Sequence, residues 1–182
     1  MNRPRTVSDE ELLDRIDAVV SQRSEHKPWG LQDVAPHVGM SPAGLLRRFG
    51  SKEQVLLALA RRWIALVPDG PRGEARPVDE LRVYVQENFD APSPSAAVFA
   101  LGELMGDLWS PASAALLREG WQKQVRYLEL LLDAVPLAPR VDAHAAALTL
   151  LDALHGALYR RAVSLEPTPP DRILDTLLET WT

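Results

Sequence analysis

The sequence predicts an all-α protein, with a small N-terminal head of three short helices followed by a larger helical bundle, the body. Apolar residues recur at spacings of three and four along most of the chain, and no segment alternates between apolar and polar residues for long enough to predict a strand. Serine caps, prolines and glycines separate these periodic segments. With 182 residues, of which 46% are hydrophobic and 25% charged, the chain has enough apolar material for a buried core.

The first helix is predicted to begin after Ser8 and to run to about residue 23. Ser8 and Glu11 have the spacing of a capping box, in which the serine hydroxyl accepts a hydrogen bond from a backbone amide of the first turn. A short second helix is predicted over residues 31–38. Pro36 lies inside it, where proline removes a backbone hydrogen bond, so we expect a kink or an early end there.

The third helix is predicted over residues 42–49, and only the turn Gly39-Met40-Ser41 separates it from the second helix. Serine is a good N-cap, and Pro42 suits the first helical position, where no amide hydrogen is needed. A fourth helix is predicted over residues 52–66, before Pro68.

A stretch rich in proline, glycine and charge, residues 68–77, marks the boundary between two predicted domains. The first domain, residues 1–67, holds the head and the connecting fourth helix, and the second, residues 68–182, holds the body. Helices of the body are predicted over residues 78–90, 95–109, 112–134, 142–164 and 170–181.

Charge is divided unevenly along the chain. Residues 1–62 contain 10 Lys and Arg against 8 Asp and Glu, whereas the remainder contains 10 against 17. A mildly basic head and an acidic body place any nucleic-acid partner at the head. The lack of cysteine excludes disulfides and thiolate metal sites, and the lack of a leader or a long apolar segment predicts a cytoplasmic protein that does not enter a membrane. We expect no metal and no cofactor.

Two short helices joined by a tight turn that contains glycine are typical of a helix-turn-helix, a motif whose second helix enters the major groove of double-stranded DNA. Here that second helix is residues 42–49. Pro42 and Ala43 at its start let the backbone approach base edges closely, and Arg47 and Arg48 are long enough to reach guanine or phosphate. The alternative for the two arginines is an ordinary solvated helix face.

Four groups of residues in and around this motif keep a fixed register: Val34-Ala35, Gly39-Met40-Ser41, Leu45, and Phe49-Gly50-Ser51-Lys52-Glu53. In these positions the chain resembles the TetR family of transcriptional regulators. The resemblance implies that Lys52 contacts a DNA phosphate and that Ser41 caps the recognition helix beside the DNA backbone. It also implies that Arg3 and Arg5 form a basic arm for the minor groove, and that the helical body dimerises.

Three positions depart from the family pattern. Leu46 stands where tyrosine is common, Arg48 where histidine or tyrosine is frequent, and Gly30 where a capping threonine or serine is frequent. Leucine cannot donate a hydrogen bond to phosphate, so the burden of binding falls on the basic residues. The residues predicted to contact DNA are Arg3, Arg5, Ser41, Pro42, Ala43, Leu46, Arg47, Arg48 and Lys52.

A single head covers too few base pairs for selective binding, so we expect a homodimer that reads two half-sites. The helix from residue 141 to 163 carries small and apolar residues on one side, and the last helix is expected to pack beside it in a four-helix bundle across a twofold axis. The predicted interface residues are Ala147, Leu151, Leu154, Leu158, Leu174 and Leu178. The alternative is that this helix belongs to the core of one chain.

The middle of the body is dense in aromatic and thioether side chains, which line many small-molecule pockets. The predicted ligand contacts are Phe99, Glu103, Met105, Trp109, Trp121, Gln124 and His155. They indicate an apolar or aromatic effector. The alternative is that the aromatic residues form ordinary core.

These features together predict a transcriptional regulator that binds a DNA operator selectively, and specifically a repressor that a small-molecule effector releases. One alternative is a helical ligand-binding or scaffold protein with weakened DNA affinity, which Leu46 and Pro36 favour. The other is an enzyme with a metal site at Asp152 and His155. We expect no enzyme, because a second ligand pair on another helix and any phosphate-binding or nucleophile motif are missing.

Overall fold

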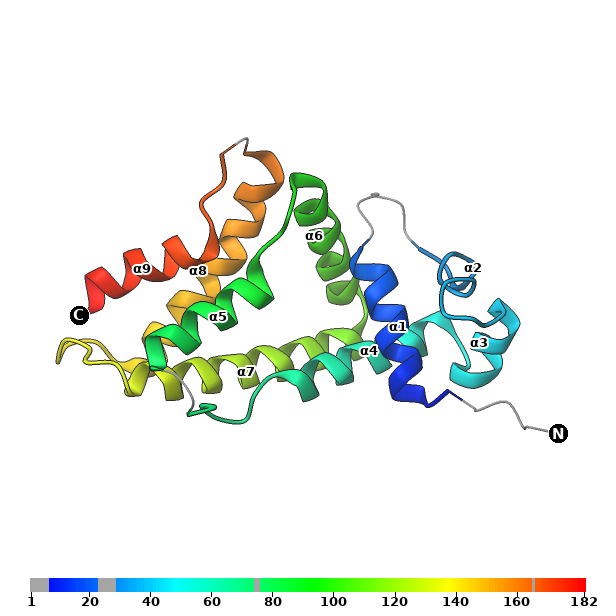
Figure 1. Cartoon of the computed structure of the whole chain (residues 1–182), viewed down its shortest axis with the longest axis horizontal. Coiled ribbons are helices and arrows are strands. Elements are labelled where there is room, and N and C mark those ends of the chain that lie inside the picture. Colours follow the sequence, from blue (N-terminus) through cyan, green and yellow to red (C-terminus); the bar gives the residue numbers. More distant parts are fainter. Residues whose placement is uncertain (1–6, 23–28, 74–75, 165) are drawn as a thin grey trace.

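The computed structural model describes residues 7–22, 29–73, 76–164 and 166–182, and these ranges fold into nine helices with no strand (Figure 1). The head contains α1 (Asp9–Ser21), α2 (Leu31–Val34) and α3 (Pro42–Phe49), and α4 (Lys52–Leu66) leads from it to the body. The body contains α5 (Pro77–Phe89), α6 (Pro94–Trp109), α7 (Pro111–Asp133), α8 (Ala143–Val163) and α9 (Pro170–Trp181). The predicted all-α class is confirmed.

Local capping explains where the head helices begin. The hydroxyls of Ser8, Ser41 and Ser51 accept hydrogen bonds from the amides of Glu11, Gly44 and Gln54, at 3.0, 3.0 and 3.1 Å. Each bond satisfies an amide that has no partner within its own helix.

The second helix ends early, as the proline within it predicts. α2 stops at Val34, and the residues that follow it form turns instead of completing a helix to residue 38. Gly39 then adopts a φ of 74°, a left-handed conformation that glycine enters without steric cost. This turn directs α3 away from α2.

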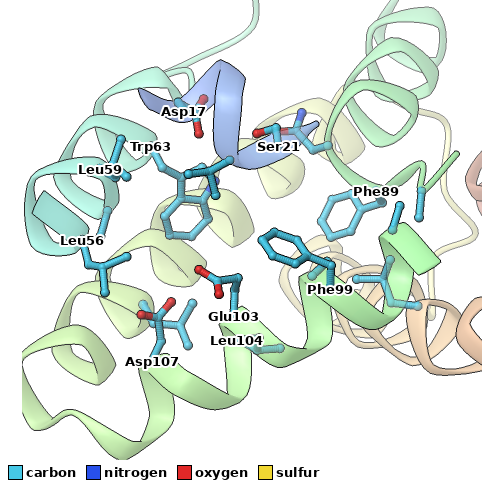
Figure 2. Close-up of a pocket in the computed structure, with 18 of the residues that line it drawn as sticks. Asp17, Ser21, Leu56, Leu59, Trp63, Phe89, Phe99, Glu103, Leu104 and Asp107 are labelled. Atoms are coloured by element: carbon cyan, nitrogen blue, oxygen red, sulfur yellow. The ribbon is translucent and has the colours of Figure 1, made fainter. Parts of the chain in front are cut away.

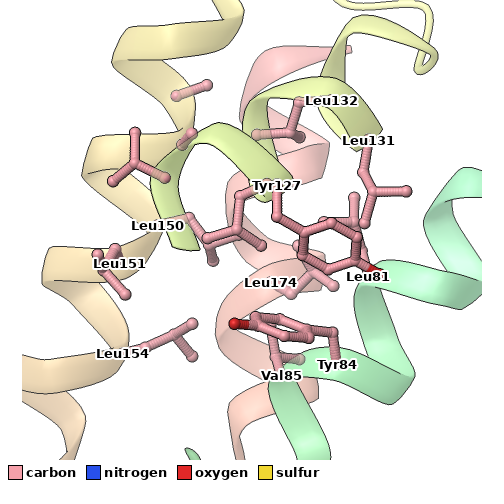
Figure 3. Close-up of a cluster of buried hydrophobic side chains, with 14 of the residues drawn as sticks. Leu81, Tyr84, Val85, Tyr127, Leu131, Leu132, Leu150, Leu151, Leu154 and Leu174 are labelled. Atoms are coloured by element: carbon pink, nitrogen blue, oxygen red, sulfur yellow. The ribbon is translucent and has the colours of Figure 1, made fainter. Parts of the chain in front are cut away.

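The apolar side chains form two separate cores. In the head, buried residues of α1, α2, α3 and α4 surround Ile16, Val34 and Leu45. In the body, α5, α7, α8 and α9 pack together around Leu81, Tyr127 and Leu150, among others (Figure 3).

α4 joins the two cores, and its C-terminal half lies against α7. Gly120 of α7 makes this approach possible, since a Cβ atom added there would come within 1.9 Å of the Trp63 ring. The Lys123 ammonium donates to the carbonyl of Ile64 at 3.2 Å and pairs with Asp69 at 2.9 Å. These contacts fasten the C-terminal end of α4 and the segment after it to α7.

Five of the six residues predicted for the dimer interface are buried within the chain itself. Ala147, Leu151 and Leu154 of α8 and Leu174 and Leu178 of α9 keep no more than 8% of their surface exposed. They pack in the body core, so they have almost no area left for a second chain. This placement agrees with the alternative of an internal core stripe for these five residues.

The sixth residue, Leu158, is also directed inward, since it lines a pocket described below. Among the helices in the described ranges, none is both long enough and apolar enough to cross a membrane.

Candidate DNA-binding surface and adjoining pocket

One face of α3 is open to solvent while the other packs on the head core. Gly44 and Leu45 are buried, whereas Pro42, Ala43 and Arg47 are exposed. Gly44 is tightly enclosed, because a Cβ atom there would lie 3.2 Å from both the Met40 methyl and the Ser41 hydroxyl. The core thus fixes the orientation of α3 and leaves its start free to meet a partner.

The exposed face of α3 combines an arginine with small and apolar side chains. Leu46 keeps 46% of its surface exposed beside Arg47, for which the described residues provide no ion-pair partner. An arginine and small or apolar residues at the start of an exposed helix suit base edges, where guanine accepts hydrogen bonds and thymine presents a methyl group.

Arg48 is placed differently from its neighbour. Its guanidinium pairs with the carboxylate of Asp9 and donates to the carbonyl of Val7 at 2.6 Å. Both acceptors lie at the start of α1, so Arg48 fastens α3 to α1. Two of its nitrogens, Nε and Nη2, therefore have partners within the chain, while the expectation that Arg48 contacts DNA stays a prediction.

Lys52 lies at the first position of α4, and its ammonium stands over the ring of Trp29, 4.5 Å from the centroid. Trp29 itself is 2% exposed. Its indole Nε1 donates to a carboxylate oxygen of Glu103 on α6 at 3.2 Å. Lys52, Trp29 and Glu103 thus form a chain of contacts from the head to the body.

Glu103 also lines a pocket of about 500 Å³ between the head and the body (Figure 2). α1, α4 and α6 supply most of its walls, and the segment after α5 closes one end. Its aromatic walls are Trp29, Trp63, Phe89 and Phe99. A second cavity of about 350 Å³ shares Phe99, Glu103 and Asp107 with the first and reaches Lys52.

Carboxyl groups project into the larger pocket from two sides. Figure 2 shows Glu103 and Asp107 rising from the same face of α6, with Asp17 of α1 on the other side of the Trp63 ring. Burial, followed by the charge of Glu103, raises the pKa of the Asp107 carboxyl. Burial also raises the pKa of the Asp17 carboxyl, although the residue as a whole stays exposed at the rim of the pocket.

Two of the seven predicted ligand contacts, Phe99 and Glu103, lie in this pocket. The other five do not line it. Gln124 is buried in the body core, where it donates to the Tyr84 hydroxyl at 3.1 Å. Met105 and Trp109 point to solvent, with Trp109 82% exposed.

Trp121 and His155, the last two predicted ligand contacts, pack against each other outside the pocket. Their rings contact each other edge to face at 5.1 Å between centroids, and His155 also contacts Phe89 in the same way at 5.4 Å. Burial lowers the pKa of His155. These two residues are packing partners, as the core alternative stated, and the described residues hold no group of three metal-ligating side chains around them or elsewhere.

The sequence does not indicate the pocket walls that come from elements other than α6. Asp17, Trp63 and Phe89 lie on three different helices, α1, α4 and α5. Their helical spacing predicts only that they face inward, and nothing local indicates a shared cavity. Arg3 and Arg5, the predicted minor-groove arm, lie outside the described residues.

No family model and no curated protein matches this sequence. Solved structures do match over nearly the whole chain. A transcriptional regulator from Rhodococcus sp. Rha1 is 18% identical with a TM-score of 0.69, covering 96% of this chain and 95% of that one. A putative transcriptional regulator from Saccharomonospora viridis, in complex with choline, is 18% identical with a TM-score of 0.69 and 92% coverage of both chains.

A third structure, the regulatory protein TetR from Rhodobacter sphaeroides, is 16% identical with a TM-score of 0.67, covering 97% of this chain and 100% of that one. At such identities the likeness concerns the fold. The chain has the all-α fold of TetR-type transcriptional regulators.

Proposed function

We propose that this protein is a transcriptional regulator that binds double-stranded DNA selectively, and that it acts as a homodimeric repressor released by a small-molecule effector. Since its proposed target is chromosomal DNA, we place it in the cytoplasm. The fold supports a regulator without catalytic activity, because the similar solved structures carry regulator names.

The observation that carries the proposal is the exposed start of α3. Pro42, Ala43, Leu46 and Arg47 are accessible together on one side of a helix whose other side is locked into the head core. A helix-turn-helix reads DNA with the N-terminal residues of its second helix, and this is the part that is free here. Ser41 and Lys52 flank it, and we retain them as proposed phosphate contacts.

A dimer needs a surface different from the one that the sequence indicated. On α8 the outward residues Leu148, Tyr159 and Val163 are 43%, 54% and 86% exposed. Exposed Ala145 and Thr149 lie on the same side, so the face offers large apolar groups beside small ones. Small residues let helices of two chains approach closely, and we propose this face as the twofold interface.

The effector is proposed to occupy the pocket between head and body. A ligand there contacts α1, α4 and α6 at once, so its binding depends on how the head is set against the body. One structurally similar regulator is in complex with choline, which supports a small-molecule effector for this fold.

Electrophoretic mobility shifts with the DNA that flanks the protein's own gene, measured across a range of salt concentrations, test the proposal. We expect selective binding that weakens as salt rises. Lys52→Ala should weaken binding to all sequences alike and reduce the salt slope by about 1, as expected for one phosphate contact. Arg140→Ala, an exposed change in the body, serves as the control and should leave affinity unchanged.

The same measurement distinguishes the regulator from the second candidate, a ligand-binding or scaffold protein with weakened DNA affinity. That candidate is favoured by the placement of Arg48, which is held by α1, and by the exposed Leu46. If selective binding is absent even at low salt, the scaffold replaces the regulator.

A further inference from the structure

The pocket between the head and the body carries several acidic groups and no basic group among its described lining residues. Its carboxylates are Asp17, Asp90, Glu103 and Asp107. None of the four takes part in an ion pair within the described part of the chain. The charge of the pocket is therefore not neutralised by the protein around it.

One described cation, Lys52, lies beside this pocket but does not line it. Lys52 lines the smaller adjoining cavity, and its ammonium stands over the Trp29 ring. Glu103 and Asp107 line that smaller cavity as well, and Glu103 accepts a hydrogen bond from the indole nitrogen of Trp29. Lys52 forms no ion pair with Glu103 or Asp107, so both carboxylates lack an ion-pair partner among the described residues.

The ionised form of the Asp107 carboxyl is energetically unfavourable in this pocket. Burial raises the pKa of Asp107, and the charge of Glu103 one helical turn away raises it further. Both effects mean that the ionised form is less stable here than in water. A positive charge placed between the two groups removes the repulsion and replaces the lost hydration.

The remaining walls suit an organic cation better than a metal ion or a bare ammonium ion. The rings of Trp63, Phe89 and Phe99 line the same space as the carboxylates, as Figure 2 shows. Aromatic faces attract cations electrostatically and bury apolar groups as well. A volume of about 500 Å³ exceeds what a small inorganic ion fills and lies in the range of small-molecule sites.

We infer that this pocket binds an organic cation, a compound with an ammonium, phosphonium or amidinium centre on an apolar or aromatic body. Its charge lies near Glu103 and Asp107, and its apolar part lies against the aromatic walls. The inference rests on the proposed function, since it specifies the chemical class of the effector for the same pocket. It narrows the apolar or aromatic compound that the sequence indicated to a positively charged one.

Isothermal titration calorimetry with two ions of the same shape and opposite charge tests the inference. Tetraphenylphosphonium is the probe and tetraphenylborate its anionic counterpart, each titrated into the full chain without DNA. We expect the cation to bind at least about tenfold more tightly, because like charges in the pocket repel the anion. Equal affinities, or no binding of the cation, would overturn the inference.

Variants locate the binding in this pocket. Glu103→Gln and Asp107→Asn each remove one charge at nearly constant shape, and each should weaken cation binding about fivefold. The matched control is Asp133→Asn, an exposed carboxylate at the end of α7, which should leave the affinity unchanged. If the pocket variants bind the cation as the control does, binding occurs elsewhere and the inference is wrong.

The experiments distinguish failure of the cation-binding inference from failure of the proposed DNA-binding function. Selective DNA binding without cation binding removes only the effector class and leaves the regulator. Cation binding that depends on Glu103 and Asp107, without any DNA binding, removes the regulator and leaves the ligand site.

Discussion

Arg47 and Arg48 are adjacent in the sequence, yet the structure gives them different surroundings. Successive residues of a helix point in directions about 100° apart, so one side chain faces solvent while the next returns to α1. The sequence alone treats both as cations on a recognition helix. Only the position of Asp9 and Val7 in the fold separates them.

We predict that Arg48→Ala lowers stability while Arg47→Ala does not. Losing the contacts to Asp9 and to the Val7 carbonyl should lower the free energy of unfolding by about 1 kcal/mol, since both partners are partly solvated. Urea unfolding of the two variants measures this. If the two variants are equally stable, Arg48 does not fasten α3 to α1.

Gly120 is a second position where one residue controls a larger arrangement. We predict that Gly120→Ala destabilises the protein by about 1–3 kcal/mol, because its Cβ would overlap the Trp63 ring of α4. Thermal unfolding compares it with Gly102→Ala on α6, whose added Cβ meets nothing within 4 Å. Alanine favours a helix over glycine, so the control should be neutral or more stable. Equal effects of the two changes would show that α4 does not press on α7 at this point.

At the scale of elements, most helix positions follow from the sequence because their signals are local. Serine caps, prolines at the first helical position and the break at Pro36 act within one or two turns, and the helices begin and end where these residues stand. The partner of each apolar stripe is not a local property. The stripe of α8 through Leu151 is buried in its own chain, although its spacing is equally compatible with a second chain.

The candidate site divides in the same way. The exposed start of α3 and the cap at Ser41 follow from a motif of a few residues. The pocket is lined jointly by α1, α4 and α6, which are separate in the sequence, so the sequence predicts only Phe99 and Glu103 among its described walls as ligand contacts. Nothing in the sequence around Trp29 indicates a contact, whereas the fold places its side chain between Lys52 and Glu103.

This contact predicts how the effector alters DNA binding. A cation that pairs with Glu103 competes for the carboxylate that accepts from Trp29, and a shift of Trp29 disturbs the ring beneath Lys52. We predict that Trp29→Phe, which removes the indole donor, reduces the factor by which tetraphenylphosphonium weakens DNA binding. Fluorescence anisotropy of labelled DNA with and without the probe measures this factor.

Trp121→Phe on α7 is the control for this measurement, because Trp121 contacts His155 in the body. It should preserve the effect of the probe on DNA affinity. Should Trp29→Phe preserve it equally, communication between the two sites does not pass through Trp29.

At the scale of the whole molecule, the proposed homodimer depends on the outward face of α8. We predict that Leu148→Arg converts dimers to monomers, because it replaces a large apolar side chain of that face with a charged one. Analytical ultracentrifugation provides the measurement. Leu130→Arg on α7 is the matched control, since Leu130 is exposed to a similar extent, and it should stay dimeric.

If Leu148→Arg stays dimeric and folded while Leu130→Arg dissociates, the interface lies on α7. The distance between the two heads of the dimer would then differ, and the spacing of the DNA half-sites would change with it.

Selection of bound sequences from random double-stranded DNA tests the central claim, that the exposed start of α3 reads base sequence. For the unchanged protein we predict an enriched pair of half-sites about 10 base pairs apart or a multiple of that distance. Arg47→Ala should lose preference at one position of each half-site, with a cost of about 1–3 kcal/mol there. The account would be contradicted if the unchanged protein enriched no sequence. It would also be contradicted if Arg47→Ala enriched the same sequence and bound it with the same affinity as the unchanged protein.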